Sequence, residues 1–246
     1  MRKVTILLLG FCLMSLTSCI DMLEELYLNK DGSGTYSITF DMSGLFSDPM
    51  MKGMMEELLQ GEGGLSLNHD LSQVMDTMIM FSDMSKEGLQ KMEKPEFWKK
   101  VSMRIVMNEG EKAFRSEVRL NFTSLDDIDY FYKNLDKLGA NEAGGGMGSM
   151  ASFLPTRGLF KLNKRNLQRL PAPKVDSSLN GEEMDMAKMF FSAASYKTTY
   201  HLPGRVARTT IPGAEVDGKT ITITNSFLDI MEGRAKLDGE IKYKKR

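Results

Sequence analysis

The sequence predicts an α+β domain in which antiparallel β-hairpins pack with helices. Apolar residues alternate with polar ones on both sides of several Gly-containing turns, which is typical of hairpins. Other segments place apolar residues at helical spacing behind a capping side chain. The 246 residues are 41% hydrophobic and 26% charged, which is typical of a globular chain and excludes a disordered or collagen-like protein.

The first predicted hairpin joins strands at 22–29 and 35–42. Residues 30–34 read Lys-Asp-Gly-Ser-Gly, and an Asp-Gly pair readily adopts the positive φ values of a tight turn. In the second strand the apolar residues fall at alternate positions, so one face of this strand is expected to be buried.

Two helices are expected next, at 49–60 and 70–84. The first begins after Ser47-Asp48-Pro49, a capping side chain followed by proline in the first turn, and Gly-rich residues 61–64 end it. We call its apolar face the Met stripe, and it consists of Met50, Met51, Met54, Met55, Leu58 and Leu59.

A long hairpin is predicted to join alternating strands at 101–107 and 114–122. Ser124 is expected to cap a helix at 125–138, whose first turn carries three aspartates near the positive end of the helix dipole. A Gly-rich segment, 139–158, follows this helix.

The remaining chain repeats the order of strand pair, helix, long hairpin and capped helix. Short strands are predicted at 159–162 and 166–170, a helix at 182–194, and a long hairpin from 196–202 to a return strand holding Ile221 and Ile223. Ser226 is expected to cap a short helix at 227–232, and a strand at 235–243 closes the chain. We therefore divide the sequence into a leader (1–18), an N-terminal α+β half (19–138), a linker loop (139–158) and a C-terminal α+β half (159–246). The two halves are related, and they form either two layers or one continuous sheet.

The N-terminus has the form of a signal peptide. Arg2 and Lys3 precede an apolar run at 4–14, which is too short to span a membrane as a helix. Leu16-Thr17-Ser18-Cys19 then resembles the lipobox of bacterial lipoproteins. That resemblance implies cleavage between Ser18 and Cys19 and acylation of Cys19, for example with palmitate. The alternative is an ordinary secretory signal with a chance cysteine.

Location is predicted from the residues around the anchor. Cys12 lies in the leader, so the mature chain has neither a free thiol nor a disulfide once Cys19 is acylated. Ile20 stands where an inner-membrane retention signal has aspartate, which favours the outer membrane. Asp21, Glu24 and Glu25 resemble an acidic surface-export tag, so both the periplasmic face and the cell surface stay open.

Motifs near the C-terminus resemble a known family. Tyr200-His201-Leu202-Pro203-Gly204, then 214–220 (Ala-Glu-Val-Asp-Gly-Lys-Thr), then a short helix are similar to a segment of LppM-type envelope lipoproteins. The resemblance implies a lipid-anchored α+β domain dominated by antiparallel strands, and it implies no catalytic residues.

The sequence contains no group of residues that predicts catalysis. The two histidines, His69 and His201, are too few for a zinc site, and His201 is expected on a polar surface. The Gly-rich run 144–148 lacks the Lys-Ser/Thr of a phosphate-binding loop, and Gly-x-Ser-x-Gly is absent. The balanced charge, 32 basic and 33 acidic residues, disfavours nucleic acid as the partner. We expect no enzyme activity, no cofactor and no metal.

The predicted function is therefore a lipid-anchored, non-enzymatic binding or structural module of the cell envelope. Its partner is an envelope protein or an amphiphile, and the Met stripe is the candidate contact face because methionine packs adaptably. The alternatives are plain core packing of the stripe, a carrier of a lipid-like ligand and Met-based Cu(I) handling, which 21 methionines make conceivable.

Overall fold

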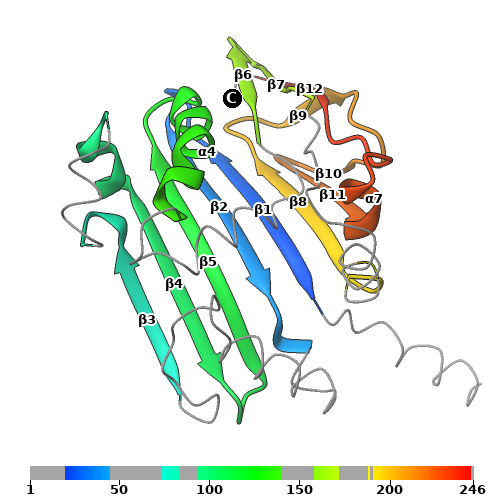
Figure 1. Ribbon diagram of the computed structural model, residues 1–246. Coiled ribbons are helices and arrows are strands. Elements are labelled where there is room, and N and C mark those ends of the chain that lie inside the picture. The colour runs from blue at the N-terminus through cyan, green and yellow to red at the C-terminus, as the bar shows by residue number, and fades with distance from the viewer. Residues whose placement is uncertain are drawn as a thin grey trace, which may run out of the picture.

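The computed structural model describes residues 20–44, 74–83, 93–139, 158–171, 188 and 191–244. These residues form a β-rich fold of two sheets with a few short helical segments (Figure 1). The expectation of an α+β domain with packed helices was therefore wrong. Its hairpins extend into one broad sheet, and a second sheet supplies much of the covering layer that helices were expected to supply.

The larger sheet contains eight strands. They are β1 (Asp21–Leu28), β2 (Gly34–Asp41), β3 (Met75–Met80), β4 (Val101–Asn108), β5 (Ala113–Phe122), β8 (Ser195–His201), β10 (Glu215–Asp217) and β11 (Thr220–Ser226). Their spatial order is β10-β11-β8-β1-β2-β5-β4-β3. Strands from the first and second predicted halves thus lie in one sheet.

The predicted hairpins are confirmed. β1 pairs antiparallel with β2, β4 with β5, and β8 with β11. One further pairing is parallel, since β1 and β8 run in the same direction, with Glu24 opposite Thr198. The long stretch of chain between these two strands makes a parallel crossover feasible, whereas a short turn would not.

The smaller sheet contains four strands in the order β6-β7-β12-β9. They are β6 (Phe160–Asn163), β7 (Asn166–Arg169), β9 (Val206–Thr209) and β12 (Gly239–Tyr243). This sheet lies near the end of β1 that is far from the N-terminus, as Figure 1 shows. Consistent with that, Gly32, in the β1–β2 turn, approaches Leu162 of β6.

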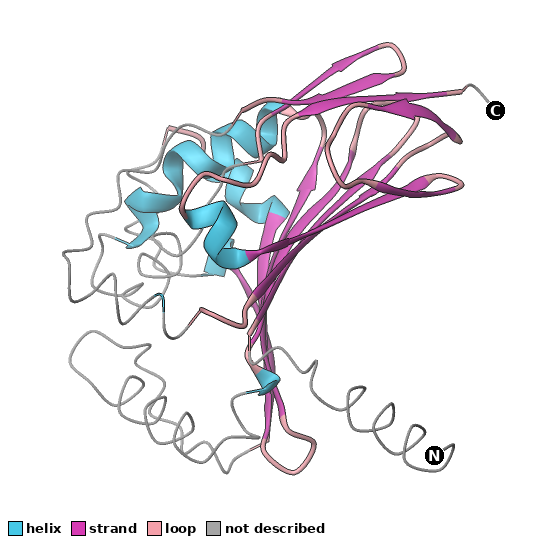
Figure 2. Cartoon of the chain, turned by 90° about the vertical axis from the view of Figure 1, so that its right-hand side faces the viewer, coloured by secondary structure: helices cyan, strands magenta, loops and turns pink. Residues whose placement is uncertain are grey.

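Helical segments lie on one side of the larger sheet (Figure 2). They are η2 (Phe81–Asp83), η3 (Pro95–Lys100), α4 (Asp126–Gly139) and α7 (Phe227–Met231). Their ends differ from expectation, because Ser226 makes no side-chain capping bond and Phe227 N–H donates to Ala194 O instead. At α4, the Asp127 carboxylate accepts hydrogen bonds from the backbone and hydroxyl of Thr123.

The predicted helix at 70–84 is wrong over its described part. Residues 75–80 form β3, which pairs antiparallel with β4 at the edge of the larger sheet. Thr77 and Ile79 are β-branched and favour strands, and the Arg104 guanidinium of β4 holds the Asp76 carboxylate at 2.7 Å. Pairing with β4 therefore determines the conformation of this segment.

Two further helix predictions lie outside the described residues, that at 49–60 entirely and that at 182–194 over most of its length. Most of the Gly-rich segment 139–158 also lies outside them. In the described strands, the alternation is confirmed, since the inward-facing side chains of β4 are buried. They are Val101, Met103, Ile105 and Met107.

Candidate functional site

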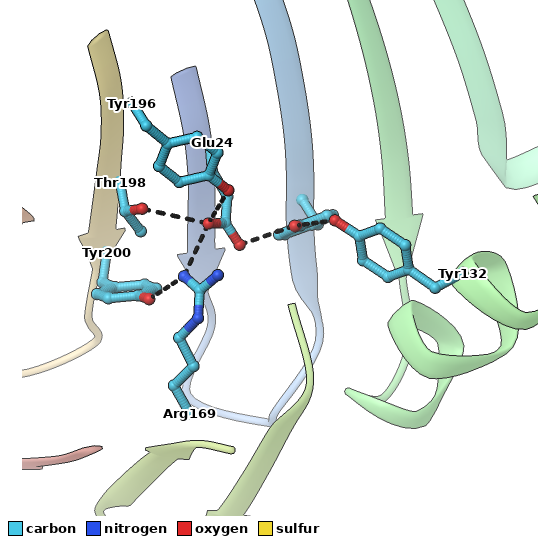
Figure 3. A network of polar contacts seen from close by, with 7 residues as sticks. Glu24, Tyr132, Arg169, Tyr196, Thr198 and Tyr200 are labelled. Atoms are coloured by element: carbon cyan, nitrogen blue, oxygen red, sulfur yellow. Dashed lines mark hydrogen bonds and ion pairs between the residues drawn. The ribbon is translucent and has the colours of Figure 1, made fainter. Parts of the chain in front are cut away.

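A network of charged and hydroxyl side chains lies inside the core, between the two sheets and α4 (Figure 3). Glu24 occupies the inward face of β1 between Met22 and Leu26, both of which are buried. Strand alternation therefore forces this carboxylate into the core. A buried carboxylate requires a counter-ion and hydrogen-bond donors, and the network supplies both.

The counter-ion is Arg169, which reaches across from β7 of the smaller sheet. Its Nη1 atom lies 2.7 Å from Glu24 Oε2, and neither side chain is more than 1% exposed. The same Nη1 donates to Tyr200 Oη at 2.6 Å. The ion pair thus joins the central strand of the larger sheet to the smaller sheet.

Hydroxyl groups donate the other hydrogen bonds that the Glu24 carboxylate accepts. Tyr36 Oη donates to Oε1 at 2.8 Å, and Tyr196 Oη donates to Oε2 at 2.8 Å. Thr198 Oγ1 donates to Oε2 at 3.2 Å. Tyr36 Oη also bonds Tyr132 Oη of α4 at 2.6 Å, so the network links the helix to both sheets.

The surroundings keep the four tyrosines of the network protonated. Burial raises the pKa of Tyr36 and Tyr196 well above the ordinary value, and the Glu24 carboxylate raises both further. Burial likewise raises the pKa of Tyr132 and Tyr200. For Arg169, burial alone would lower the pKa, but the Glu24 carboxylate and the neighbouring tyrosine hydroxyls together outweigh burial, and the pKa lies above its usual range.

Close packing surrounds these groups. A Cβ atom on Gly158 would lie 2.7 Å from Tyr36 Oη and 2.8 Å from Glu24 Oε1, so only glycine fits there. The Phe160 ring lies 5.7 Å from the Arg169 guanidinium, close enough for a cation–π contact. Arg169 Nη2 is buried without a hydrogen-bond partner, so the network leaves one donor unsatisfied.

This arrangement is suited to holding the fold together. Every member is buried, the two charges neutralise each other, and the hydroxyl groups bond to one another, to Glu24 or, at Tyr200, to Arg169. Within the part of the chain that the structure describes, no group of three His, Cys, Asp or Glu residues could hold a metal ion.

The described histidine, His201, lies on the opposite, outward face of β8. Its ring stacks on Tyr27 of β1, with centroids 3.9 Å apart and planes 8° from parallel. Its Nε2 lies 3.7 Å from Glu25 Oε1, beyond hydrogen-bond distance. His201 is half-buried in a polar face, in agreement with the sequence-based expectation.

The site residues predicted from sequence lie outside the described residues. These are Ser18, Cys19 and all six members of the Met stripe: Met50, Met51, Met54, Met55, Leu58 and Leu59. The buried network was missed, although a signal was present. Glu24 interrupts the apolar face of β1, and Arg169 shares a face with buried Leu167 of β7. Glu24, one of the three acids that resemble an export tag, has a fully buried carboxylate.

The described chain begins one residue after Cys19, and that residue is fixed in the fold. Ile20 is 4% exposed, and its carbonyl accepts a hydrogen bond of 3.1 Å from Ser195 N–H. β1 begins at Asp21, at the centre of the larger sheet. Ile20 alone therefore separates Cys19 from β1 in the sequence.

The same end of the sheet contains several other chain segments, and we call it the anchor end, after the acylation that the sequence predicts at Cys19. Register places Asp41, the last residue of β2, opposite Asp21, and Arg115 of β5 opposite Asp41. The β4–β5 turn around Gly110 and the start of β3 after Val74 consequently lie at this end too. No helix long and apolar enough to cross a membrane occurs among the described residues.

Comparison with known proteins gives one similar structure. No protein-family model and no curated protein match the sequence. The NMR structure of the folded domain of the LppM protein of Mycobacterium tuberculosis is similar over 92% of this chain and 91% of that chain, with a TM-score of 0.40 and 10% sequence identity. A score and identity this low establish neither a shared fold nor a shared function.

Proposed function

We propose that this protein is a lipid-anchored envelope module that binds a partner and performs no chemistry. Cys19 is its anchor, acylated after cleavage behind Ser18, and the outer membrane is its location. The observation that carries the proposal is the lipobox sequence at 16–19, immediately followed by the central strand of a folded domain.

The absence of a tether supports a role close to the bilayer. A strand residue spans about 3.3 Å, so Ile20 alone separates the acylated cysteine from β1 by only a few ångströms. Two or three acyl chains hold such a domain at the membrane essentially permanently, because each buried methylene contributes about 0.8 kcal/mol. The domain is thus presented at a fixed distance from the lipid surface.

A non-enzymatic role is supported by the chemistry of the polar core. Catalysis requires groups that can reach a substrate, and the Glu24–Arg169 network is closed to solvent. A carrier of lipid-like ligands is the alternative, and lipid extracted from the purified protein would favour it.

Detergent phase partition tests the anchor. We expect wild-type protein in the detergent phase and the Cys19→Ser variant in the aqueous phase or as uncleaved precursor. The matched control is Cys12→Ser, which removes the other cysteine of the chain and should behave as wild type. Wild-type protein in the aqueous phase would overturn the proposal.

A further inference from the structure

A concentration of unpaired positive charge covers the smaller sheet and its turns. We call it the basic face, and it consists of Lys161, Lys164, Arg165, Arg205, Arg208, Lys242 and Lys244, all exposed. None of them forms an ion pair within the described residues, although exposed basic residues elsewhere do, as Arg104 and Arg115 show. Glu240 is the only acidic residue in the four strands of this sheet.

The register of the sheet concentrates this charge. Lys242 of β12 lies directly opposite Arg208 of β9, and like charges in that position destabilise a sheet. The end of β12 also lies between two further basic segments, because Tyr243 N–H donates to Arg165 O and Lys244 N–H donates to Arg205 O. Among the described residues, seven exposed cations without an ion pair therefore lie together on this surface, in a chain whose formal charge is only −1.

We propose that the basic face binds an acidic polysaccharide. Guanidinium and ammonium groups recognise carboxylates through charge-assisted hydrogen bonds, and the exposed sheet with its turns presents several of them on one surface to a polymer that carries many carboxylates. The proposal rests on the proposed function for the location of the domain, whereas the binding itself requires no acyl chain.

Other anionic partners fit this surface less well. Single-stranded nucleic acid requires aromatic rings for base stacking, and the exposed large apolar residues of the described chain (Tyr27, Val74, Met78 and Val216) all lie outside the smaller sheet. The same lack of exposed apolar anchors disfavours an acidic protein, whose binding would rely on them.

The bilayer that holds the anchor is also the poorer partner. The smaller sheet lies near the far end of β1, and eight strand residues place that end about 26 Å from the anchor end. The anchor end, held by Ile20, faces the lipid, so the basic face is directed away from it.

The test measures retention of the full mature lipoprotein, in detergent micelles, on immobilised polygalacturonate. The methyl-esterified polymer has the same backbone without the charge and serves as the ligand control. We expect wild type to bind polygalacturonate, to be released by salt and to ignore the ester. The Arg208→Gln/Lys242→Gln variant should lose several-fold in affinity, with no fall in melting temperature because it removes a repulsive pair.

The matched control variant is Lys112→Asn/Lys197→Gln. It removes the same charge from two exposed positions near the anchor end and should bind as wild type does. Equal losses in both variants, or no retention of wild type at low salt, would overturn the proposal. In vesicles of phosphatidylethanolamine and phosphatidylglycerol, quenching of a fluorophore at Lys164→Cys by headgroup spin labels would assign the face to the bilayer instead. Only the vesicle experiment depends on acylation of Cys19. Loss of polygalacturonate binding would therefore count against the basic face alone, and absence of acylation would count against the proposed function alone.

Discussion

Glu24 and Arg169 are 145 residues apart in the sequence, and their side chains meet at 2.7 Å in the core. One belongs to the larger sheet and the other to the smaller sheet, so the pair joins the two layers. Replacing one partner leaves the other as a buried, uncompensated charge, which costs more than the pair itself contributes.

The ion pair should therefore show strong coupling in a double-mutant cycle. We expect Arg169→Met and Glu24→Met each to lower the free energy of unfolding by about 3–5 kcal/mol, because each isolates a buried charge. The double variant should cost clearly less than the sum, with a coupling of at least about 2 kcal/mol. Urea unfolding followed by circular dichroism measures all three. Additive effects would mean that the two charges are independently solvated.

Gly158 should resist any side chain. Its surroundings leave no space for a Cβ atom beside Tyr36 and Glu24, so Gly158→Ala is expected to cost about 1–3 kcal/mol through overpacking. Gly110→Ala is the matched control, since the new Cβ would lie 3.4 Å from Asn108 Oδ1 on an exposed turn and should cost less than about 0.5 kcal/mol. Equal melting temperatures for the two variants would contradict the packing.

The network predicts steep unfolding in alkali. A tyrosine whose pKa is raised by folding stabilises the protein fully below its unfolded pKa of about 10 and progressively less as pH rises above it. Above that pH, each such residue lowers the free energy of unfolding by about 1.4 kcal/mol per pH unit. The effects of Tyr36, Tyr132, Tyr196 and Tyr200 add together. Phenolate absorbance of these four should appear only with unfolding. Their titration in the folded protein would refute the burial of the network.

The missing tether predicts a defined orientation at the membrane. Apart from Cys19, the mature chain has no thiol, so an introduced cysteine carries a fluorophore uniquely. In vesicles, headgroup spin labels should quench probes at Gly110→Cys and Val74→Cys, both at the anchor end, several-fold more than a probe at Lys30→Cys in the opposite turn. Equal quenching at both ends would show that the domain lies flat or tumbles freely.

The sequence predicts the hairpins well because the period of two is strong wherever one face is buried. Tyr36 and Ile38, for instance, are inward-facing and nearly fully buried, as the alternation of 35–42 requires. The helix predicted at 70–84 is wrong because the strand that replaces it is stabilised by long-range pairing. Asp76 and its neighbours pair with β4, which is distant in sequence, and local spacing does not reveal that partner.

The core network could be predicted only in part. Glu24 and Arg169 are visible as charges on apolar strand faces, but nothing local indicates that they face each other. Their meeting depends on the parallel pairing of β1 with β8 and on how the smaller sheet packs, both of which are long-range features. Tyr132 joins them from a helix whose position depends on the same packing.

The most direct test of the central claim is mass spectrometry of the N-terminal peptide of protein purified from cell envelopes. The account predicts that the chain begins at Cys19 and that this residue carries a diacylglycerol on sulfur, with or without a further acyl chain on its amine. A chain that retains Met1, or that begins at an unmodified residue, would contradict lipid anchoring.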